Sequence, residues 1–212
     1  MDETQTDAPT GRSARTRASL IEATLARLRA DGSFTAEQVA ADAGVSVATI
    51  YNRFPDGRDG LLAAAFDRSL DRVVAASTGT LTADHLLDHG LDGTMRAMVD
   101  GLAAAFADEA LVMRAALARL PEIQALREAY RRHEATAREV NRRFVELCQA
   151  AGRIGDGDPD ELADVLIVLG QGLNNPVLLG ATDRGRLHSR LATAMVAALA
   201  PRAPAAPDEP EA

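Results

Sequence analysis

The chain has 212 residues, a formal net charge of −8 at pH 7 and one cysteine, Cys148. This length suits one small and one larger domain, and we expect no membrane-spanning helix because no apolar run is long enough to cross a bilayer. The first ten residues are acidic and unlike a signal peptide, and a lone cysteine cannot form an internal disulfide. We therefore expect a cytoplasmic protein.

The negative charge is unevenly distributed along the chain. Residues 11–60 carry seven arginines against six acidic residues, whereas residues 61–212 carry sixteen against twenty-two. Binding to nucleic acid requires basic residues only where a surface meets phosphate. The net charge therefore neither establishes nor excludes a nucleic-acid partner.

The chain begins with a polar segment, residues 1–10, that we expect to be disordered. An amphipathic helix is predicted over Ser13–Ala30, because apolar side chains recur every three or four residues from Leu20 to Leu28. Asp31-Gly32 is expected to end it.

Two short helices about a tight turn are predicted next. Thr35 and Gln38 have the spacing of a capping box, which starts a helix that runs to Ala43. Gly44 follows where a left-handed residue closes a helix, and Ser46 is a typical N-cap for the second helix.

The spacing within this pair is more specific than its caps. Ala40, Gly44 and Ile50 stand four and six residues apart, as the small residue, the turn glycine and the buried residue do in a helix-turn-helix. An ordinary helical hairpin is the alternative, but it has no need of this spacing. A helix-turn-helix places its second helix in the major groove of DNA.

The segment VAADAGVSVATIYNRFPDGRDGLL resembles the N-terminal signature of the TetR family of transcriptional regulators. In that family the recognition helix ends in Tyr-x-x-Phe, which matches Tyr51 and Phe54, and a further helix begins just afterwards. Val47, Arg53 and Arg58 stand where the family commonly has a basic residue, a histidine and a lysine. The resemblance covers residues 14 to 75.

This resemblance implies a dimeric regulator that binds a palindromic operator in double-stranded DNA, most often a repressor released by a small molecule. An activator or a ligand-independent regulator is the alternative within the same class. A small-molecule enzyme or carrier with an attached DNA-binding module is the alternative from another class. A purely structural helical protein would leave the helix-turn-helix spacing unexplained.

The middle of the chain is predicted to be helical. A turn at 55–57 precedes a helix over 58–77, and a Gly/Thr-rich break at 77–84 separates it from a loose helix over 83–107, interrupted near Gly90. A short helix over 109–119 follows, and Pro121 is expected to open a long amphipathic helix that ends at 151.

The last part of the chain is predicted to form two helices that mediate dimerisation. The segment 160–179 is apolar on nearly every side, so we expect a helix that packs against its own core and a second subunit and is bent or ended by Pro176. A final helix is predicted over 183–199, and the Pro-rich acidic tail 201–212 is expected to be disordered. In the TetR family the last two long helices form the homodimer interface, which implies that role for 160–179 and 183–199.

The predicted fold is therefore all-α, with about nine helices. It comprises an N-terminal three-helix helix-turn-helix DNA-binding domain at 11–57, a connecting helix at 58–80, and a ligand-binding and dimerisation domain at 81–200.

Candidate DNA contacts lie mainly on the second short helix. Asn52 can read adenine, and Val47 or Ala48 can contact a thymine methyl group. Contacts to phosphate are expected from a larger set: Arg15, Arg17, Thr35, Ser46, Thr49, Tyr51, Arg53 and Arg58. Thr35 and Ser46 have the alternative of acting only as caps, and Arg53 that of a solvated charge.

Candidate effector contacts lie in the C-terminal part. Most are apolar or Met-rich and suit a largely apolar small molecule, although each is equally suited to a plain core: Met98, Leu102, Phe106, Met113, Leu117 and Phe144. His133 lies on the apolar face of the long helix. Gln171, Asn174 and Asn175 are amides within an apolar segment, and we expect them to be buried and to bond a ligand, each other or the partner subunit.

No catalytic or metal-binding constellation is evident. Asp84, His85, Asp88 and His89 place two histidines one helical turn apart, but a convincing third ligand is missing, so no metal site is predicted. Cys148 is interpreted as a buried inert thiol because the chain has no resolving cysteine. We predict no cofactor and no enzyme activity.

Overall fold

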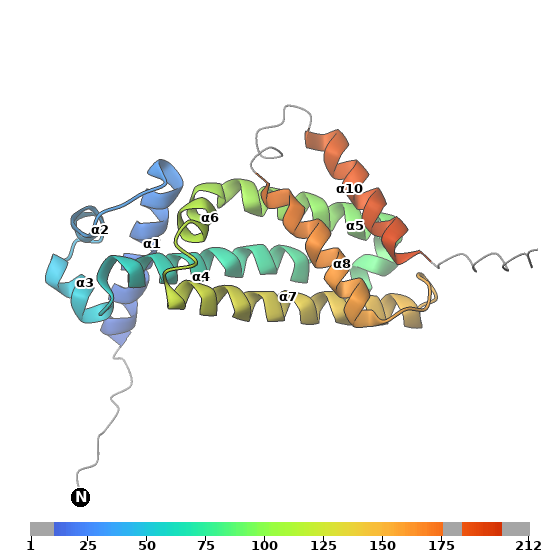
Figure 1. Cartoon of the computed structure of the whole chain (residues 1–212), viewed down its shortest axis with the longest axis horizontal. Coiled ribbons are helices and arrows are strands. Elements are labelled where there is room, and N and C mark those ends of the chain that lie inside the picture. Colours follow the sequence, from blue (N-terminus) through green and yellow to red (C-terminus); the bar gives the residue numbers. More distant parts are fainter. Residues whose placement is uncertain (1–10, 176–183, 201–212) are drawn as a thin grey trace, which may run out of the picture. The chain divides into compact units, whose positions relative to one another are not determined.

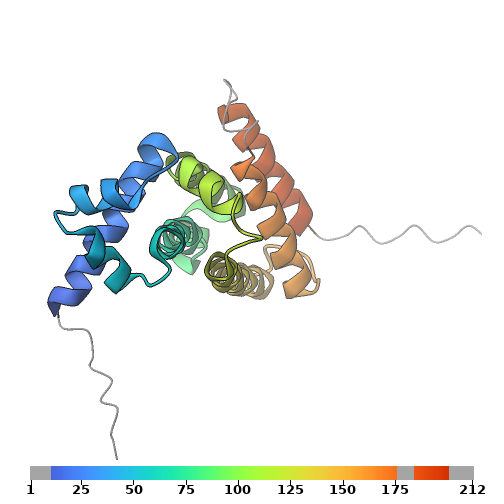
Figure 2. The same ribbon diagram turned by 60° about the vertical axis from the view of Figure 1, so that its left-hand side comes forward.

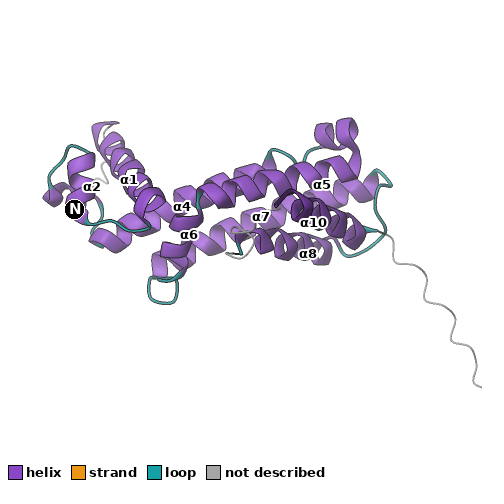
Figure 3. Cartoon of the chain, turned by 90° about the horizontal axis from the view of Figure 1, so that it is seen from above, coloured by secondary structure: helices purple, strands orange, loops and turns teal. Residues whose placement is uncertain are grey.

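The structure, a computed structural model, describes residues 11–175 and 184–200 (Figure 1). All regular secondary structure in these two ranges is helical, and no strand occurs in them (Figure 3). The all-α prediction is confirmed. The segments predicted to be disordered, 1–10 and 201–212, lie outside the described residues, as does Pro176.

The helices follow the predicted order closely. The N-terminal ones are α1 (Gly11–Asp31), α2 (Ala36–Asp42), α3 (Val47–Arg53) and α4 (Gly57–Thr78). The next are α5 (Ala83–Asp108), α6 (Ala110–Leu117) and α7 (Gln124–Ala150). The last are α8 (Pro159–Gln171), a short 3-10 turn η1 (Gly172–Asn174) and α10 (Arg184–Leu199).

The chain forms two compact units, and both are discontinuous in sequence. Among the described residues, the first unit comprises those up to Val74 together with Ala105–Glu134, and the second comprises Ala75–Ala104 together with those from Ala135 onward. The division between the units therefore falls within α4, α5 and α7.

The first unit has a core built on α1. This helix packs against α2 and α6, and α2 packs against α3; Figure 2 gives a second view of these helices. Leu20 and Leu25 of α1, Val39 of α2 and Ile50 of α3 are all fully buried. Each such side chain stabilises the fold by about 1.5–3 kcal/mol relative to an exposed one. The helix α2 is therefore held by packing on α1, and α3 by packing on α2.

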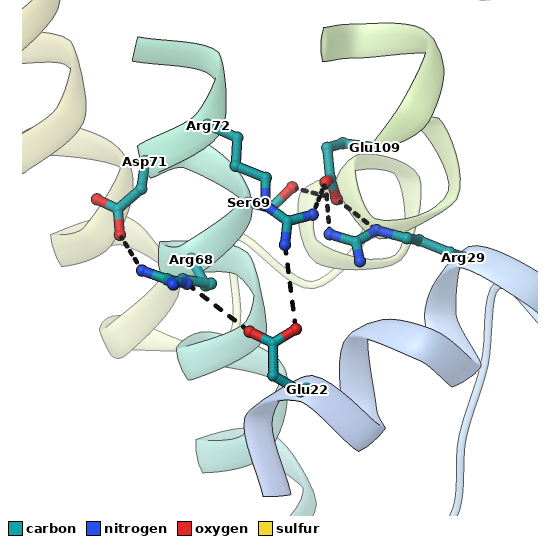
Figure 4. Close-up of polar contacts among 7 residues, drawn as sticks. All are labelled: Glu22, Arg29, Arg68, Ser69, Asp71, Arg72 and Glu109. Atoms are coloured by element: carbon teal, nitrogen blue, oxygen red, sulfur yellow. Dashed lines mark hydrogen bonds and ion pairs between the residues drawn. The ribbon is translucent and has the colours of Figure 1, made fainter. Parts of the chain in front are cut away.

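A buried carboxylate joins three helices of the first unit (Figure 4). Glu109 lies just before α6 and has a side chain only 1% exposed. It accepts hydrogen bonds from Arg29 of α1 (2.5 Å), Ser69 of α4 (2.9 Å) and Arg72 of α4 (3.0 Å). Burial raises the pKa of Glu109, but the hydrogen bonds from Arg29 and Ser69 outweigh it and hold the pKa below its ordinary value. The carboxylate is therefore charged in the folded protein at neutral pH.

The second unit contains the contact between α8 and α10. Its core includes Met95 and Phe144 from α5 and α7, Leu166 from α8 and Met195 from α10, all of them 0% or 1% exposed. Gly170 of α8 lies directly against this core, because a Cβ built there would stand 3.3 Å from a methyl group of Leu102. A small residue is therefore needed at this position.

The predicted interruption of α5 is confirmed. Gly90 has φ 65° and ψ −178°, a conformation that residues other than glycine rarely adopt, and it divides the helix into two parts. Thr94 donates its hydroxyl to the Gly90 carbonyl (2.8 Å), so the helix carbonyl at the break keeps a hydrogen-bond partner.

The start of α7 differs from the prediction. The helix begins at Gln124, and Pro121 lies in a turn before it. The reason is a side chain: Arg127 donates to the carbonyls of Leu120 (3.0 Å) and Pro121 (2.7 Å), which stabilises the turn in place of a further helical turn.

The helix α8 ends earlier than the predicted segment 160–179. The helix ends at Gln171 and passes through η1 to Asn175, which has the extended backbone (ψ 127°) that a residue before proline favours. Val168 is 69% exposed, so α8 is not buried all round within this chain. Within the single chain Gln171 and Asn175 are exposed and Asn174 is half-buried, so their contact with a ligand or a partner subunit remains a prediction.

Candidate nucleic-acid interface

The start of α2 is fixed by the predicted capping box. The Thr35 hydroxyl accepts the Gln38 N–H (3.2 Å), and the Gln38 side chain accepts the Thr35 N–H (2.8 Å). Two backbone donors that a helix leaves unpaired are thereby satisfied. Because both groups of Thr35 are used in this way, the structure gives this residue the role of a cap.

The turn between the helices also follows the predicted chemistry. Gly44 has φ 66°, the left-handed conformation expected after a helix. Ser46 then caps α3, since its hydroxyl accepts the Thr49 N–H (3.3 Å) and lies 3.0 Å from the Thr49 hydroxyl. The direction of α3 is thus set locally by one glycine and one serine.

The third helix is anchored by a single side chain. Of the seven residues of α3, Ile50 is the one that is buried, at 0% exposure. Ala48, Tyr51, Asn52 and Arg53 are exposed, while Val47 and Thr49 are half-buried. The helix therefore presents an outer surface with an amide, a phenol and small apolar groups, which are the groups that read base edges and contact phosphate in the major groove.

Tyr51 rests on the start of α4. Its side chain is 54% exposed, and its ring lies over Gly57, where a Cβ added to the glycine would stand 2.7 Å from the ring atom Cε1. Gly57 also has φ 53°, so this position requires glycine for both backbone and contact reasons. The Tyr51 ring is thereby held against the protein while its face remains accessible.

The candidate arginines divide into two kinds. Arg17 and Arg58 make internal contacts: Arg17 donates to the Arg53 carbonyl (3.3 Å), and Arg58 donates to the Phe34 carbonyl (3.2 Å). Arg15 donates to the Gly11 carbonyl within its own helix (3.2 Å). Among residues 11–175 and 184–200, the Arg53 guanidinium makes no hydrogen bond or ion pair. Arg53 is therefore the candidate whose charge is most available to a partner.

An acidic residue near this surface is neutralised. Asp42 of α2 forms two hydrogen bonds with Arg27 of α1, at 2.6 and 2.8 Å, and this arginine lowers the pKa of Asp42. The pair has no net charge, so α2 adds less repulsion toward an anionic partner than its composition suggests.

Comparison with solved structures decides the fold. A protein of Mesorhizobium loti MAFF303099 assigned to the TetR family of transcriptional regulators superposes with a TM-score of 0.73 at 22% identity, covering 90% of this chain and 97% of that one. A TetR transcription regulator of Haloarcula marismortui ATCC 43049 gives 0.70 at 21% identity, covering 88% and 98%. The chain has the TetR-family fold.

A protein of Pseudomonas aeruginosa PAO1 assigned as a transcriptional regulator has 26% identity and a TM-score of 0.64, covering 88% of this chain and 90% of that one. No family model matches the sequence, and no curated protein matches it. The TetR-family fold is thus established by the structural likeness together with the near-complete coverage.

The candidate effector residues are divided between the two units of this TetR-family fold. The first unit holds Phe106, Met113, Leu117 and His133, and the second holds Met98, Leu102, Phe144, Gln171, Asn174 and Asn175. Most of the apolar members are buried, but Leu117 is 38% exposed.

His133 has polar contacts on both ring nitrogens. Nδ1 lies 2.8 Å from the Ala129 carbonyl, and Nε2 lies 3.0 Å from a carboxylate oxygen of Asp71 on α4. Both contacts are within the first unit, so His133 links α7 to α4 there.

The histidine pair and the cysteine considered in the sequence analysis lie in ordinary surroundings. The rings of His85 and His89 lie 4.4 Å apart, but within the described ranges no three His, Cys, Asp or Glu side chains are grouped to hold a metal ion. Cys148 is fully buried, and burial raises its pKa to about 11. Across the same ranges no helix combines the length and apolarity needed to cross a bilayer.

Sequence reasoning missed Glu109 and the reason for Gly57. Glu109 bonds residues 37 to 80 positions away, so no local pattern marks it. The sequence places Gly57 in a turn, which its positive φ supports, but the turn alone does not predict the contact of Gly57 with the Tyr51 ring.

Proposed function

We propose that the protein is a sequence-specific DNA-binding transcription regulator that acts in the cytoplasm as a dimeric repressor. The observation that carries the proposal is the outer surface of α3, where Tyr51 and Asn52 are exposed while Ile50 anchors the helix. The likeness to solved TetR-family regulators supports the same function.

Each candidate contact has a specific task in this proposal. Asn52 is the group suited to reading adenine, because its amide can donate and accept together, and Val47 or Ala48 suits a thymine methyl group. Tyr51, Thr49, Arg15 and Arg53 are proposed to contact phosphate and so to set the register on DNA. Thr35 and Ser46 act as caps, because their hydroxyl groups accept the backbone N–H groups of Gln38 and Thr49.

Selection of bound duplexes from random DNA by the purified protein tests this function. We expect the wild type to enrich a palindrome. Tyr51→Ala should weaken binding to the selected duplex, and Asn52→Ala should relax preference at one base pair of each half-site, at a cost of about 1–3 kcal/mol. Leu87→Ala, which alters an exposed side chain of α5 (75% exposed), is the control. No enrichment at low salt and at physiological salt would refute the proposal.

We propose that the homodimer forms through α8 and α10. Val165 and Val168 of α8 are 39% and 69% exposed in the single chain, and burial of such a face against a second copy would be favourable. Sedimentation velocity should give a dimer for the wild type. Val168→Asp should shift it toward monomer, whereas Leu87→Asp, an equal change at another exposed apolar residue, should not. Equal behaviour of the two variants would contradict this interface.

We propose that a small, largely apolar molecule releases the protein from DNA by binding to the predicted domain formed by residues 81–200. The Met and Phe side chains predicted to contact it suit an adaptable apolar site. A panel of apolar compounds can be screened for those that raise the melting temperature, since a ligand that binds the folded state stabilises it. A compound that raises the melting temperature must also weaken binding to the selected duplex; stabilisation without release would contradict the repressor mechanism.

A further inference from the structure

Two arginines lie over phenylalanine rings at the two ends of the helix-turn-helix. The guanidinium carbon of Arg17 on α1 lies 4.2 Å from the centroid of Phe54, which follows α3. The guanidinium carbon of Arg58 on α4 lies 5.1 Å from the centroid of Phe34, which precedes α2. Both phenylalanines are buried, at 3% and 4% exposure. Cations at these distances are attracted by the face of the ring.

Each arginine also bonds the backbone at the same end. Arg17 donates to the carbonyl of Arg53, the last residue of α3, and Arg58 donates to the carbonyl of Phe34 itself. Carbonyls at a helix C-terminus lack a partner within the helix and carry partial negative charge, so a cation at the end of α3 is doubly favourable. Each arginine therefore contacts one aromatic ring and one backbone carbonyl.

The Arg17 contacts affect the orientation of α3 more than whether the helix forms. The helix has seven residues, is anchored inside by Ile50 and is capped at its start by Ser46. Its far end is fixed by Phe54 packing and by Arg17. A helix of this length held at one end only would pivot, and a small rotation would move Tyr51 and Asn52 relative to a DNA groove.

We propose that Arg17 is a positioning residue that holds the recognition helix in its DNA-reading orientation, and that Arg58 holds the segment before α2, in place of the phosphate contacts that the sequence suggests for them. The inference rests on the proposed DNA-binding function. It assigns Arg17 the larger effect, because its guanidinium lies closer to its ring and bonds α3 directly.

Charge and shape can be separated by substitution at Arg17. Arg17→Lys keeps the charge but loses the planar guanidinium group, which can stack on an aromatic ring and donate hydrogen bonds in a fixed fork. Arg17→Gln loses both the charge and the guanidinium group. Arg53→Gln is the matched control, because it removes one arginine whose guanidinium has no hydrogen bond or ion pair among the described residues. Phe54→Leu removes the ring and leaves Arg17 in place.

Binding is measured by fluorescence anisotropy over a salt series, with the duplex selected by the wild type and with a random duplex. We expect Arg17→Lys and Arg17→Gln each to weaken binding to the selected duplex by about threefold to tenfold. Binding to the random duplex and the salt dependence should stay at the wild-type values. Arg53→Gln should weaken both duplexes alike and reduce the slope of log affinity against log salt by about 0.9. In the Phe54→Leu background the effect of Arg17→Gln should largely disappear.

Other outcomes overturn the inference. If Arg17→Lys binds like the wild type while Arg17→Gln reduces the salt slope, Arg17 contacts phosphate. If both variants lower only the melting temperature and bind the selected duplex like the wild type, the contacts are merely structural.

Failure of the proposed function is distinguished by hydrogen exchange. Even if the wild type binds no duplex, Arg17→Lys should accelerate amide exchange at the C-terminal end of α3 relative to α1. Unchanged exchange there would show that Arg17 does not hold the helix, whatever the protein binds.

Discussion

The buried carboxylate of Glu109 gives the sharpest test of what holds the first unit together. Glu109→Gln keeps the shape of the side chain but removes the charge that Arg29 and Arg72 neutralise. Removing one partner of a buried ion pair costs about 3–5 kcal/mol. Here the two guanidinium groups are 28% and 45% exposed and can regain water, so we expect a loss of about 2–3 kcal/mol in the free energy of unfolding.

A matched control lies in the same cluster. Glu22 is 52% exposed and reaches Arg68 and Arg72 only at 3.8 and 4.0 Å (Figure 4). An ion pair in that setting contributes about 0–1 kcal/mol, so Glu22→Gln should be nearly neutral. Both variants remove one negative charge from the same patch. A difference between them therefore measures burial and hydrogen bonding at Glu109, not net charge.

The difference in the free energy of unfolding between wild type and Glu109→Gln should change with pH in a defined direction. Because the folded pKa of Glu109 lies below its ordinary value of 4.5, its charged form stabilises the fold above that value, and this contribution is lost as the pH falls through the folded pKa. Urea unfolding should therefore show the largest gap between wild type and Glu109→Gln near neutral pH, with the gap closing in acid. Equal stability of the Glu109 and Glu22 variants at neutral pH, or a gap that does not change with pH, would refute this reasoning.

Three further predictions concern local features. Gly57→Ala and Gly44→Ala should each lower the free energy of unfolding by about 1–2 kcal/mol, since both glycines have a left-handed backbone conformation. Only Gly57→Ala should weaken DNA binding, because only a Cβ at Gly57 would meet the Tyr51 ring. Equal DNA affinities of the two variants would contradict this contact. Thr35→Ala should cost about 1 kcal/mol in urea unfolding, with Thr35→Ser close to wild type, whereas equal losses would exclude the cap. Cys148 should react with a thiol reagent much more slowly in the native protein than in urea at mildly alkaline pH, because burial disfavours the thiolate; equal rates would show that the site opens freely.

Local chemistry is the part of the molecule that can be predicted from sequence. The Thr35 and Ser46 caps and the break at Gly90 each depend on residues within a turn or two of one another, so their geometry follows from short stretches of sequence. The helix-turn-helix spacing is local in the same sense. The domain boundary predicted from the Gly/Thr-rich break at residues 77–84 remains a prediction.

Contacts between distant segments could not be predicted. Glu109 meets Arg29 across 80 residues of sequence, and Arg17 meets the Arg53 carbonyl across 36, so neither leaves a periodic signal. Apolar periodicity at α8 shows that its side chains are apolar, but not whether the same chain or a second subunit covers them. Gln171 and Val168 are exposed within the single chain.

The single anchor of α3 has a consequence for how such a protein diverges. Because Ile50 is the one residue of α3 that the fold buries, Ala48 and Asn52 can be exchanged at little cost in stability. Under the proposed function, new DNA preferences could then accumulate in a duplicated gene by single substitutions without passing through an unfolded intermediate. The same property would make α3 a practical place to engineer the proposed regulator toward a chosen operator, with Ile50, Gly44 and Ser46 left unchanged.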